Sequence, residues 1–287
     1  MKTLYSLKDI DALQRNGGLD SIPTNAILTP SARDRLKEFR MSNTEKPAPA
    51  KGLEGVVAAT TKLSSVRGLD GELIYRGYNI NELAGNATYE EVVHLLHRGK
   101  LPNEAELASL KAELAAARDL PSGVMDIIRQ LPKEASPMRA IRTVVSALAC
   151  YEPPEGQDSL ELQTKRAIKL IAQVPVITAY FHLARQDKPL LDSDPSLGEA
   201  ANFLYLIDGK KPIEEKEKTI DMCYILHADH GMNASTFSAR VTIATLSGMY
   251  SAITSAIGTL KGPLHGGANE GVIKMLQEIG SLDKVDD

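Results

Sequence analysis

Apolar residues recur along most of this chain with the three-to-four-residue spacing of amphipathic helices, and proline or glycine marks the breaks. This pattern predicts consecutive helices at residues 104–117, 123–130, 137–150, 160–185 and 197–207. Pro175 lies inside the fourth of them, and because proline removes a backbone donor we expect a kink or a division there. The chain is therefore predicted to be mainly α-helical.

One stretch has the pattern of a β-hairpin instead. Residues 55–66 are rich in Val and Thr, residues 68–71 form a Gly-Leu-Asp-Gly turn, and a second extended run follows at residues 72–77. Just downstream, Asn79 and Thr88 stand where N-caps begin helices.

The first 50 residues have a different organisation. We expect two short helices, at residues 6–15 and 29–39, with Thr29 as the N-cap of the second, and a flexible linker at residues 42–50. Such a pair of helices suits a docking module or a DNA reader. Basic and acidic residues alternate in it, whereas phosphate binding requires a clustered positive face, so docking or packing is the favoured interpretation.

Two further helices, predicted at residues 234–248 and 250–260, consist mostly of Ala, Ser, Thr and Gly, and charge is confined to Arg240 and Lys261. Helices this apolar all round must be buried, and small side chains allow close approach of their axes. Burial against the same helices of a second copy would form a twofold interface. The alternative is a central pair in a monomer core.

Composition places the protein among ordinary globular chains. It has 287 residues, 43% hydrophobic and 24% charged, with a net charge of −4, which allows one or two domains and makes nucleic acid or an acidic membrane an unlikely main partner. Cys150 and Cys223 are interpreted as core residues in a reducing compartment. We see no secretory signal and no stretch of about 20 apolar residues, so a cytoplasmic location is expected.

His265 is the strongest candidate for a catalytic residue. Gly262 and Pro263 end the preceding helix, Gly266 and Gly267 follow the histidine, and another amphipathic helix begins nearby. The positive end of that helix disfavours a protonated imidazole, so His265 is expected to be a neutral donor. Such a donor polarises a carbonyl while a base removes the neighbouring proton. Ser235 could orient the ring.

Plainer interpretations stay open. His265 could mark a turn and His230 could cap a helix. A zinc site at His227 and His230 is rejected, because the two are three residues apart rather than four and no Cys/His cluster completes a tetrahedral set. Arg139 and Arg142 flank an apolar helix, where they could face an anionic ligand or solvent.

These residues also carry a family resemblance. The motifs are His-Ala-Asp-His-Gly-Met-Asn-Ala-Ser-Thr-Phe at 227–237, Lys-Gly-Pro-Leu-His-Gly-Gly-Ala-Asn-Glu at 261–270, Lys-Gly-Leu-Glu-Gly-Val-Val-Ala-Ala-Thr-Thr at 51–61, Ile-Tyr-Arg-Gly-Tyr at 74–78 and Ala-Asn-Phe-Leu-Tyr at 201–205. From about Gly52 onward the chain resembles citrate synthases, which condense acetyl-CoA with oxaloacetate.

The resemblance implies roles for four residues. His265 would be the neutral histidine that stabilises the acetyl-CoA enol, and Ser235 its orienting partner. His230 and Asn233 would bind oxaloacetate. The activity implied is that of an acyltransferase of the tricarboxylic acid cycle that uses acetyl-CoA as substrate, needs no metal or redox cofactor, and forms a homodimer or higher homo-oligomer.

The resemblance also implies a domain plan. Residues 1–50 would be an appendage and linker, residues 51–264 a citrate-synthase-like multi-helical large domain with a short N-terminal β-hairpin, and residues 265–287 the start of a largely absent small domain. The family's general base is a downstream aspartate, and the aspartates of residues 283–287 lack its surroundings. We therefore expect this chain alone to lack the catalytic aspartate.

Several alternatives remain. The chain could be a 2-methylcitrate synthase, because acetyl-CoA and propionyl-CoA differ by one methylene and such discrimination leaves little trace in a sequence. It could be one subunit of a split citrate synthase completed by a second polypeptide, or a truncated enzyme. It could also be a non-catalytic oligomeric scaffold for the N-terminal module. The CoA-binding residues are not identified.

Overall fold

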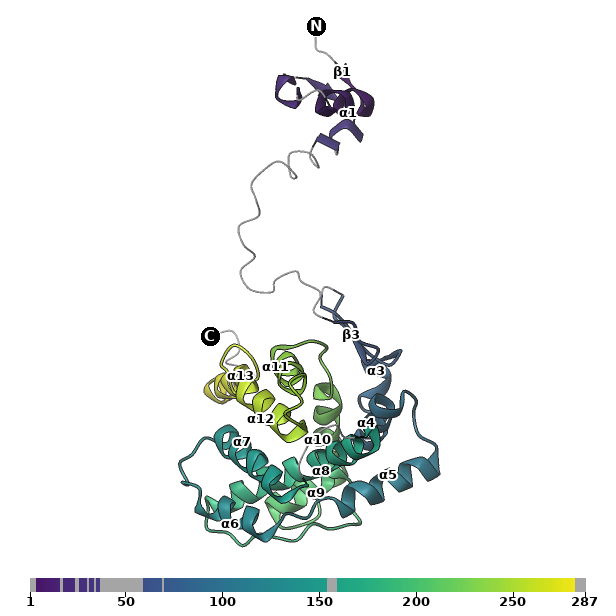
Figure 1. Cartoon of the computed structure of the whole chain (residues 1–287). Coiled ribbons are helices and arrows are strands. Elements are labelled where there is room, and N and C mark those ends of the chain that lie inside the picture. The colour runs from purple at the N-terminus through teal and green to yellow at the C-terminus, as the bar shows by residue number, and fades with distance from the viewer. Residues whose placement is uncertain are drawn as a thin grey trace. The chain divides into compact units, whose positions relative to one another are not determined.

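A computed structural model describes residues 4–15, 18–23, 26–29, 31–33, 35–36, 59–68, 70–153 and 159–281. The chain divides into two compact units, Met1–Thr60 and Thr61–Asp287 (Figure 1). The linker predicted at residues 42–50 lies outside the described residues. The predicted domain limits at residues 50 and 264 stay predictions.

The smaller unit contains the first predicted helix and two strands that were not predicted. Its elements are β1 (Leu4–Tyr5), α1 (Leu7–Arg15), the 3-10 helix η1 (Leu19–Ser21) and β2 (Ile27–Leu28). The strands pair in parallel, Leu4 with Ile27 and Tyr5 with Leu28. Strands of two residues are too short to show an alternating pattern, so they could not be predicted from the sequence.

The second predicted helix of this unit is partly described. Residues 31–33 and 35–36 are helical, and the Ala32 backbone N–H donates to the Thr29 hydroxyl at 3.3 Å, as an N-cap requires. Ile10, Ala32 and Leu36 form a small buried cluster that packs α1 against this segment.

The larger unit begins with a three-stranded antiparallel sheet and is otherwise helical. Its strands are β3 (Ser64–Arg67), β4 (Glu72–Tyr75) and β5 (Tyr78–Asn79). Its helices are α3 (Ile80–Leu83), α4 (Tyr89–Arg98), α5 (Glu104–Ala116), α6 (Ser122–Gln130), α7 (Pro137–Leu148), α8 (Leu160–Ala184), α9 (Glu199–Asp208), α10 (Glu214–His227), α11 (Ala234–Ile243), α12 (Met249–Leu260) and α13 (Gly267–Ile279), with a 3-10 turn η2 (Ala149–Tyr151) after α7. The mainly α-helical prediction is confirmed.

The predicted hairpin is present, but its first strand begins at Ser64, and residues 51–58 lie outside the described part. The predicted caps after it are also present. Asn79 begins α3 and Thr88 begins α4, each through a capping box with the glutamate three residues on. These caps satisfy the first amides of both helices and so fix where the helices start.

Helix α8 runs through the middle of the larger unit and packs on α5, α6, α7, α9 and α12 (Figure 1). Pro175 lies inside it without dividing it, contrary to one of the expected outcomes. Val176 and Ile177 next to the proline are almost fully buried, so packing compensates for the lost backbone hydrogen bond. By length and composition α8 could cross a membrane, which the sequence analysis did not anticipate; 56% of that stretch is buried inside the unit, as in a core helix.

Three further expectations were wrong. Helix α10 was not predicted, because its first half carries too many charges to show an apolar face. Helix α11 ends at Ile243 and not at Gly248, since the Thr242 carbonyl accepts from the hydroxyls of Thr245 and Ser247 and the helix cannot continue. Cys150 and Cys223 are exposed and are not core residues.

Candidate functional site

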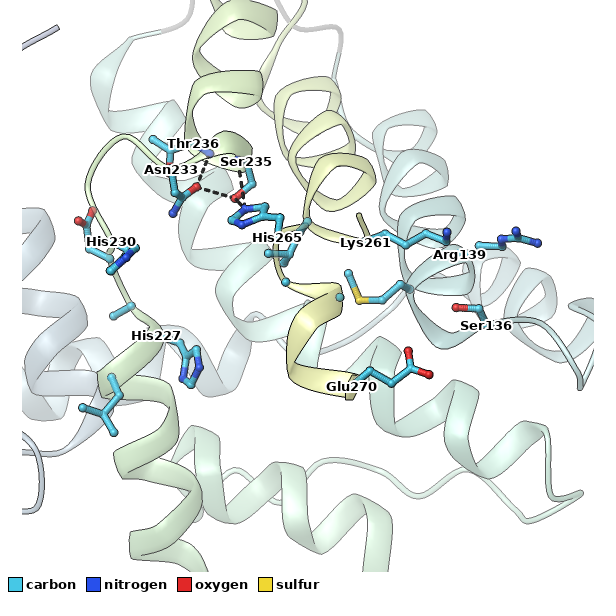
Figure 2. Close-up of a pocket in the computed structure, with 17 residues that line it drawn as sticks. Ser136, Arg139, His227, His230, Asn233, Ser235, Thr236, Lys261, His265 and Glu270 are labelled. Atoms are coloured by element: carbon cyan, nitrogen blue, oxygen red, sulfur yellow. Dashed lines mark hydrogen bonds between the residues drawn. The ribbon is translucent and has the colours of Figure 1, made fainter. Parts of the chain in front are cut away.

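A cavity of about 960 Å³ lies where five helix ends of the larger unit meet. It is lined by the end of α10 and the loop after it, the start of α11, the end of α12, the start of α13 and the first turn of α7 (Figure 2). All four candidate site residues, His230, Asn233, Ser235 and His265, line this cavity. The structure therefore brings together residues from two separate sequence motifs.

The loop after α10 is held by a residue that the sequence did not identify. The Tyr75 hydroxyl of β4 lies 3.1 Å from the Ile225 carbonyl and 2.9 Å from the Asp229 carbonyl, and the Asp229 N–H donates to it at 3.1 Å. The Asp229 carboxylate accepts from the Gly231 N–H at 2.7 Å and from the Ser64 hydroxyl. No local sequence pattern could reveal contacts between residues about 150 positions apart.

Asn233 begins α11 and also holds Ser235. Its side-chain oxygen accepts the Thr236 N–H at 2.9 Å, which is an N-cap, and the Ser235 hydroxyl at 2.8 Å. This oxygen already accepts two hydrogen bonds from the protein. The side-chain nitrogen is therefore the part of Asn233 that a ligand could contact.

His265 stands in a tight turn between α12 and α13. Its N–H and that of Gly267 both donate to the Gly262 carbonyl, at 3.0 and 3.1 Å. A Cβ at Gly266 would lie 2.5 Å from a Leu260 methyl and 2.8 Å from the Leu260 carbonyl, and one at Gly267 would lie 2.8 Å from the Gly262 carbonyl. A larger side chain would clash at both positions. The Gly-Gly pair therefore allows the tight turn that places His265 just before the first residues of α13.

The ring of His265 is fastened by Ser235 (Figure 2). Its Nε2 lies 2.9 Å from the Ser235 hydroxyl and accepts the Ser235 backbone N–H at 3.3 Å. An acceptor nitrogen carries a lone pair, so the proton of the ring belongs on Nδ1. Nδ1–H is then the donor of the ring, and the neutral donor histidine expected from the sequence stays a prediction.

The other ionisable groups of the cavity are two carboxylates, two cations and His227. Glu270 pairs with Lys274 at 2.8 Å, and this hydrogen-bonded ion pair lowers the pKa of Glu270. Arg139, which the sequence analysis left open between ligand and solvent, lines the cavity together with Lys261. His227 points Nδ1 at the Cys223 carbonyl, 2.7 Å away. Within the described ranges no group of three His, Cys, Asp or Glu side chains is placed to hold a metal.

Comparison with known proteins gives a consistent result. The family description "Citrate synthase, C-terminal domain" matches residues 52–287. The chain is similar to the citrate synthase of Haloferax volcanii, with 48% identity over 81% of this chain and 62% of that protein, and to the 2-methylcitrate synthase of Shewanella oneidensis, with 41% identity over 83% and 63%.

Among solved structures, a citrate synthase from Thermoplasma acidophilum, described as a ternary complex with carboxymethyl coenzyme A and oxaloacetate, aligns with a TM-score of 0.76 at 34% identity. The alignment covers 80% of this chain and 61% of that one. The fold and the cavity thus define a helical protein with a histidine-centred site. The chain belongs to the citrate synthase family, and it spans about three fifths of the length of the relatives it matches.

Proposed function

We propose that this chain serves the condensation of acetyl-CoA with oxaloacetate to citrate and CoA. The observation that supports this most directly is the contact of His265 with Ser235: Nε2 accepts the Ser235 backbone N–H and lies 2.9 Å from the Ser235 hydroxyl, which leaves Nδ1–H to donate. Membership of the citrate synthase family supports the same activity.

In the proposed reaction, His265 Nδ1–H donates to the thioester oxygen of acetyl-CoA. A base removes a methyl proton, and the hydrogen bond stabilises the negative charge that develops on that oxygen in the enol. The enol carbon then attacks the keto carbon of oxaloacetate, which His230 and the Asn233 side-chain nitrogen bind. Hydrolysis of the citryl-CoA thioester releases citrate and CoA.

We do not assign the base to either carboxylate of the cavity. The Asp229 carboxylate accepts from Ser64 and Gly231, and the pKa of Glu270 is lowered by its ion pair with Lys274, which makes it a weaker base. We propose that a segment resembling a citrate synthase small domain, on this polypeptide or on a second one, supplies the base.

The apolar residues of α13 support the proposal of a small-domain-like segment. Val272, Ile273, Met275 and Leu276 are all about half exposed, at spacings that place them on one broad face of the helix. Such a face is normally covered by another element. A small-domain-like segment would both cover α13 and bring a base to the cavity.

A homodimer is proposed on the evidence of α11. This helix has no buried residue, and Val241 and Ile243 on it are exposed. The loop that follows exposes Leu246 as well. A second copy packed on α11 would cover these residues, as the small-residue composition also indicates.

We propose that the protein is located in the cytoplasm.

The test is thiol release from acetyl-CoA with oxaloacetate, measured on the full chain alone and mixed with a citrate synthase small-domain polypeptide. We expect activity in the mixture and a loss of about 100- to 1,000-fold in His265→Ala, the range for removing one such donor. Ser281→Ala, at the far end of the described chain beyond α13, serves as the control. No activity with either arrangement, or activity that His265→Ala leaves unchanged, would refute the proposal.

Propionyl-CoA in place of acetyl-CoA tests the alternative of a 2-methylcitrate synthase. The greater identity to the citrate synthase from Haloferax volcanii favours acetyl-CoA as the better substrate. A higher kcat/KM with propionyl-CoA would reverse that assignment and keep the role of His265.

A further inference from the structure

The rings of the two site histidines are positioned in different ways. Nε2 of His265 contacts the backbone N–H and the hydroxyl of Ser235. The His230 ring lines the same cavity but has no hydrogen bond or ion pair to any residue that the structure describes (Figure 2). The position of the His230 ring is therefore set by its backbone, and so by the residues on either side of it, Asp229 and Gly231.

Asp229 is attached to the three-stranded sheet at two points. Its N–H donates to the Tyr75 hydroxyl at 3.1 Å, and its carbonyl lies 2.9 Å from the same hydroxyl. Its carboxylate accepts from the Ser64 hydroxyl. Ser64 and Tyr75 stand directly opposite each other in the antiparallel pairing of β3 with β4. The residue before His230 is thus bonded to neighbouring positions of one sheet.

Tyr75 is a rigid anchor for this loop. Its side chain is fully buried in an apolar cluster with Ile80, Leu95 and Ile225, so it cannot change rotamer without displacing its neighbours. Its hydroxyl also lies 3.1 Å from the Ile225 carbonyl in the last turn of α10. Burial raises the pKa of the Tyr75 hydroxyl, so the group stays protonated and remains a donor through the neutral pH range.

Gly231 holds the loop on the other side of His230. Its φ of +63° lies in the left-handed region that favours glycine, and its N–H donates to the Asp229 carboxylate at 2.7 Å. A Cβ at Gly231 would lie 3.9 Å from the Val66 side chain of β3. Both neighbours of His230 therefore lie against the sheet.

We propose that Tyr75 and Ser64 are positioning residues for oxaloacetate binding, and that they act through the loop on His230. The inference rests on the proposed function, in which His230 binds oxaloacetate. Neither Tyr75 nor Ser64 lines the cavity, so the effect of both on the ligand is indirect. A loop already held in one conformation loses less conformational entropy when a ligand binds, and its affinity for the ligand is correspondingly higher.

Isothermal titration calorimetry with oxaloacetate tests the proposal, on the full chain alone and mixed with a citrate synthase small-domain polypeptide. Tyr75→Phe and Ser64→Ala each remove one hydroxyl, and Ser64→Thr keeps it. Tyr180→Phe is the matched control. The Tyr180 side chain is buried on α8 and does not line the cavity, and its hydroxyl donates to the Leu191 carbonyl at 2.8 Å.

We expect Tyr75→Phe and Ser64→Ala each to weaken oxaloacetate binding about 10-fold, the factor that corresponds to one ordinary hydrogen bond. Ser64→Thr and Tyr180→Phe should bind oxaloacetate as the unsubstituted chain does. Urea melts should show similar losses of stability for Tyr75→Phe and Tyr180→Phe, because each loses a buried hydroxyl. The two tyrosine variants thus separate positioning of the loop from a general loss of stability.

A double-mutant cycle with His230→Ala shows whether the effect passes through His230. If it does, Tyr75→Phe has no further effect on oxaloacetate affinity once His230 is replaced, since the ring that Tyr75 positions is gone. A loss as large as in the unsubstituted background would place the action of Tyr75 elsewhere and overturn the proposal.

Two further results overturn the proposal and leave the proposed function intact. One is an oxaloacetate affinity that neither Tyr75→Phe nor Ser64→Ala changes, and the other is an equal loss of affinity in Tyr180→Phe. Unchanged affinity in His230→Ala would remove His230 from the oxaloacetate site, and this inference with it, without touching the role of His265. If the unsubstituted chain binds no oxaloacetate in either arrangement, the proposed function and this inference fail together.

Discussion

Helices α8 and α11 represent two contrasting regions of the larger unit. Eleven of the 25 residues of α8 are buried, and most of its buried apolar residues belong to two apolar clusters of the core. α11 has no buried residue, and α13 exposes its apolar side chains. The first region is packed within the larger unit, whereas the second leaves apolar side chains exposed.

The site draws on the exposed region and on another buried cluster. Ser235 lies in α11 and His265 just before α13, while Tyr75 and Ile225 anchor the loop of His230 in that buried cluster. The loop of His230 is thus held by contacts within the larger unit, whereas the apolar residues of α11 and α13 are exposed.

The largest expected effect is a difference between the two regions in the free energy of unfolding that an Ile→Ala substitution removes. Ile177→Ala on α8, fully buried, is expected to lower the free energy of unfolding by about 2–5 kcal/mol. Ile273→Ala on α13, 54% exposed, should cost less than about 0.5 kcal/mol in the chain alone. Urea denaturation followed by circular dichroism measures both, and equal losses would mean that the chain itself covers α13.

The next effect is a dependence of stability on pH that arises in the buried region. Burial raises the pKa of Glu199 to about 7, Glu90 adds to the rise and Arg118 opposes it. Arg118 donates to Glu199 at 2.8 and 3.0 Å, and all three side chains are buried. The folded protein therefore retains a proton that the unfolded chain, with the ordinary glutamate pKa of 4.5, has already lost.

The sign follows from this difference. The stabilisation is fully present below pH 4.5 and is lost as the pH rises to about 7, by about 3 kcal/mol at 1.36 kcal/mol per unit. Urea melts across this window should show the decline, and Glu199→Gln should flatten it. Glu270→Gln on the exposed side is the control. A slope that persists in Glu199→Gln would contradict the assignment.

A third test concerns self-association through α11. Val241 is 53% exposed, and Val241→Asp would place a charge in the proposed dimer contact, raising the dissociation constant about 100-fold. Leu160→Asp at the start of α8, 81% exposed, is the matched control and should leave association unchanged. Sedimentation velocity over a range of concentrations distinguishes them. A Val241→Asp protein that associates as before would remove α11 from the interface.

The smallest effect compares two helix caps. Asn233→Ala and Asn103→Ala each remove an N-cap, of α11 and α5, and should each cost about 1 kcal/mol in a urea melt. Only Asn233 also holds the Ser235 hydroxyl, so only Asn233→Ala should reduce thiol release as well. Equal activity in the two variants would show that Asn233 is a cap and nothing more.

Local chemistry made much of the fold predictable. The caps at Asn79 and Thr88 follow from residues within three positions, and their helices begin where the sequence indicates. Helix α10 was missed because its charged first half shows no apolar face, and the contacts that hold it are to residues far away in the sequence. Ile225 belongs to the cluster around Tyr75, and Asp221 accepts the Tyr89 N–H at 3.0 Å.

The site shows the same contrast between local features, which the sequence predicts, and distant contacts, which it does not. Glycines on both sides of His265 pointed to a tight turn before a helix, and that turn is where the histidine stands. The involvement of Tyr75 could not be inferred, because a phenol that holds a loop leaves no periodicity and no spacing in the chain. The opposed placement of His230 and Lys261 across the cavity was equally hidden, since it depends on how α10 and α12 pack.

The Tyr75 hydroxyl has a consequence for the kinetics of opening. It accepts the Asp229 N–H, and the Asp229 carboxylate accepts the Gly231 N–H, so two loop amides are protected by a residue rooted in the sheet. Their hydrogen–deuterium exchange should follow the opening of the β4 cluster instead of the faster fluctuations expected of a surface loop. The loop that carries His230 would then open together with the sheet.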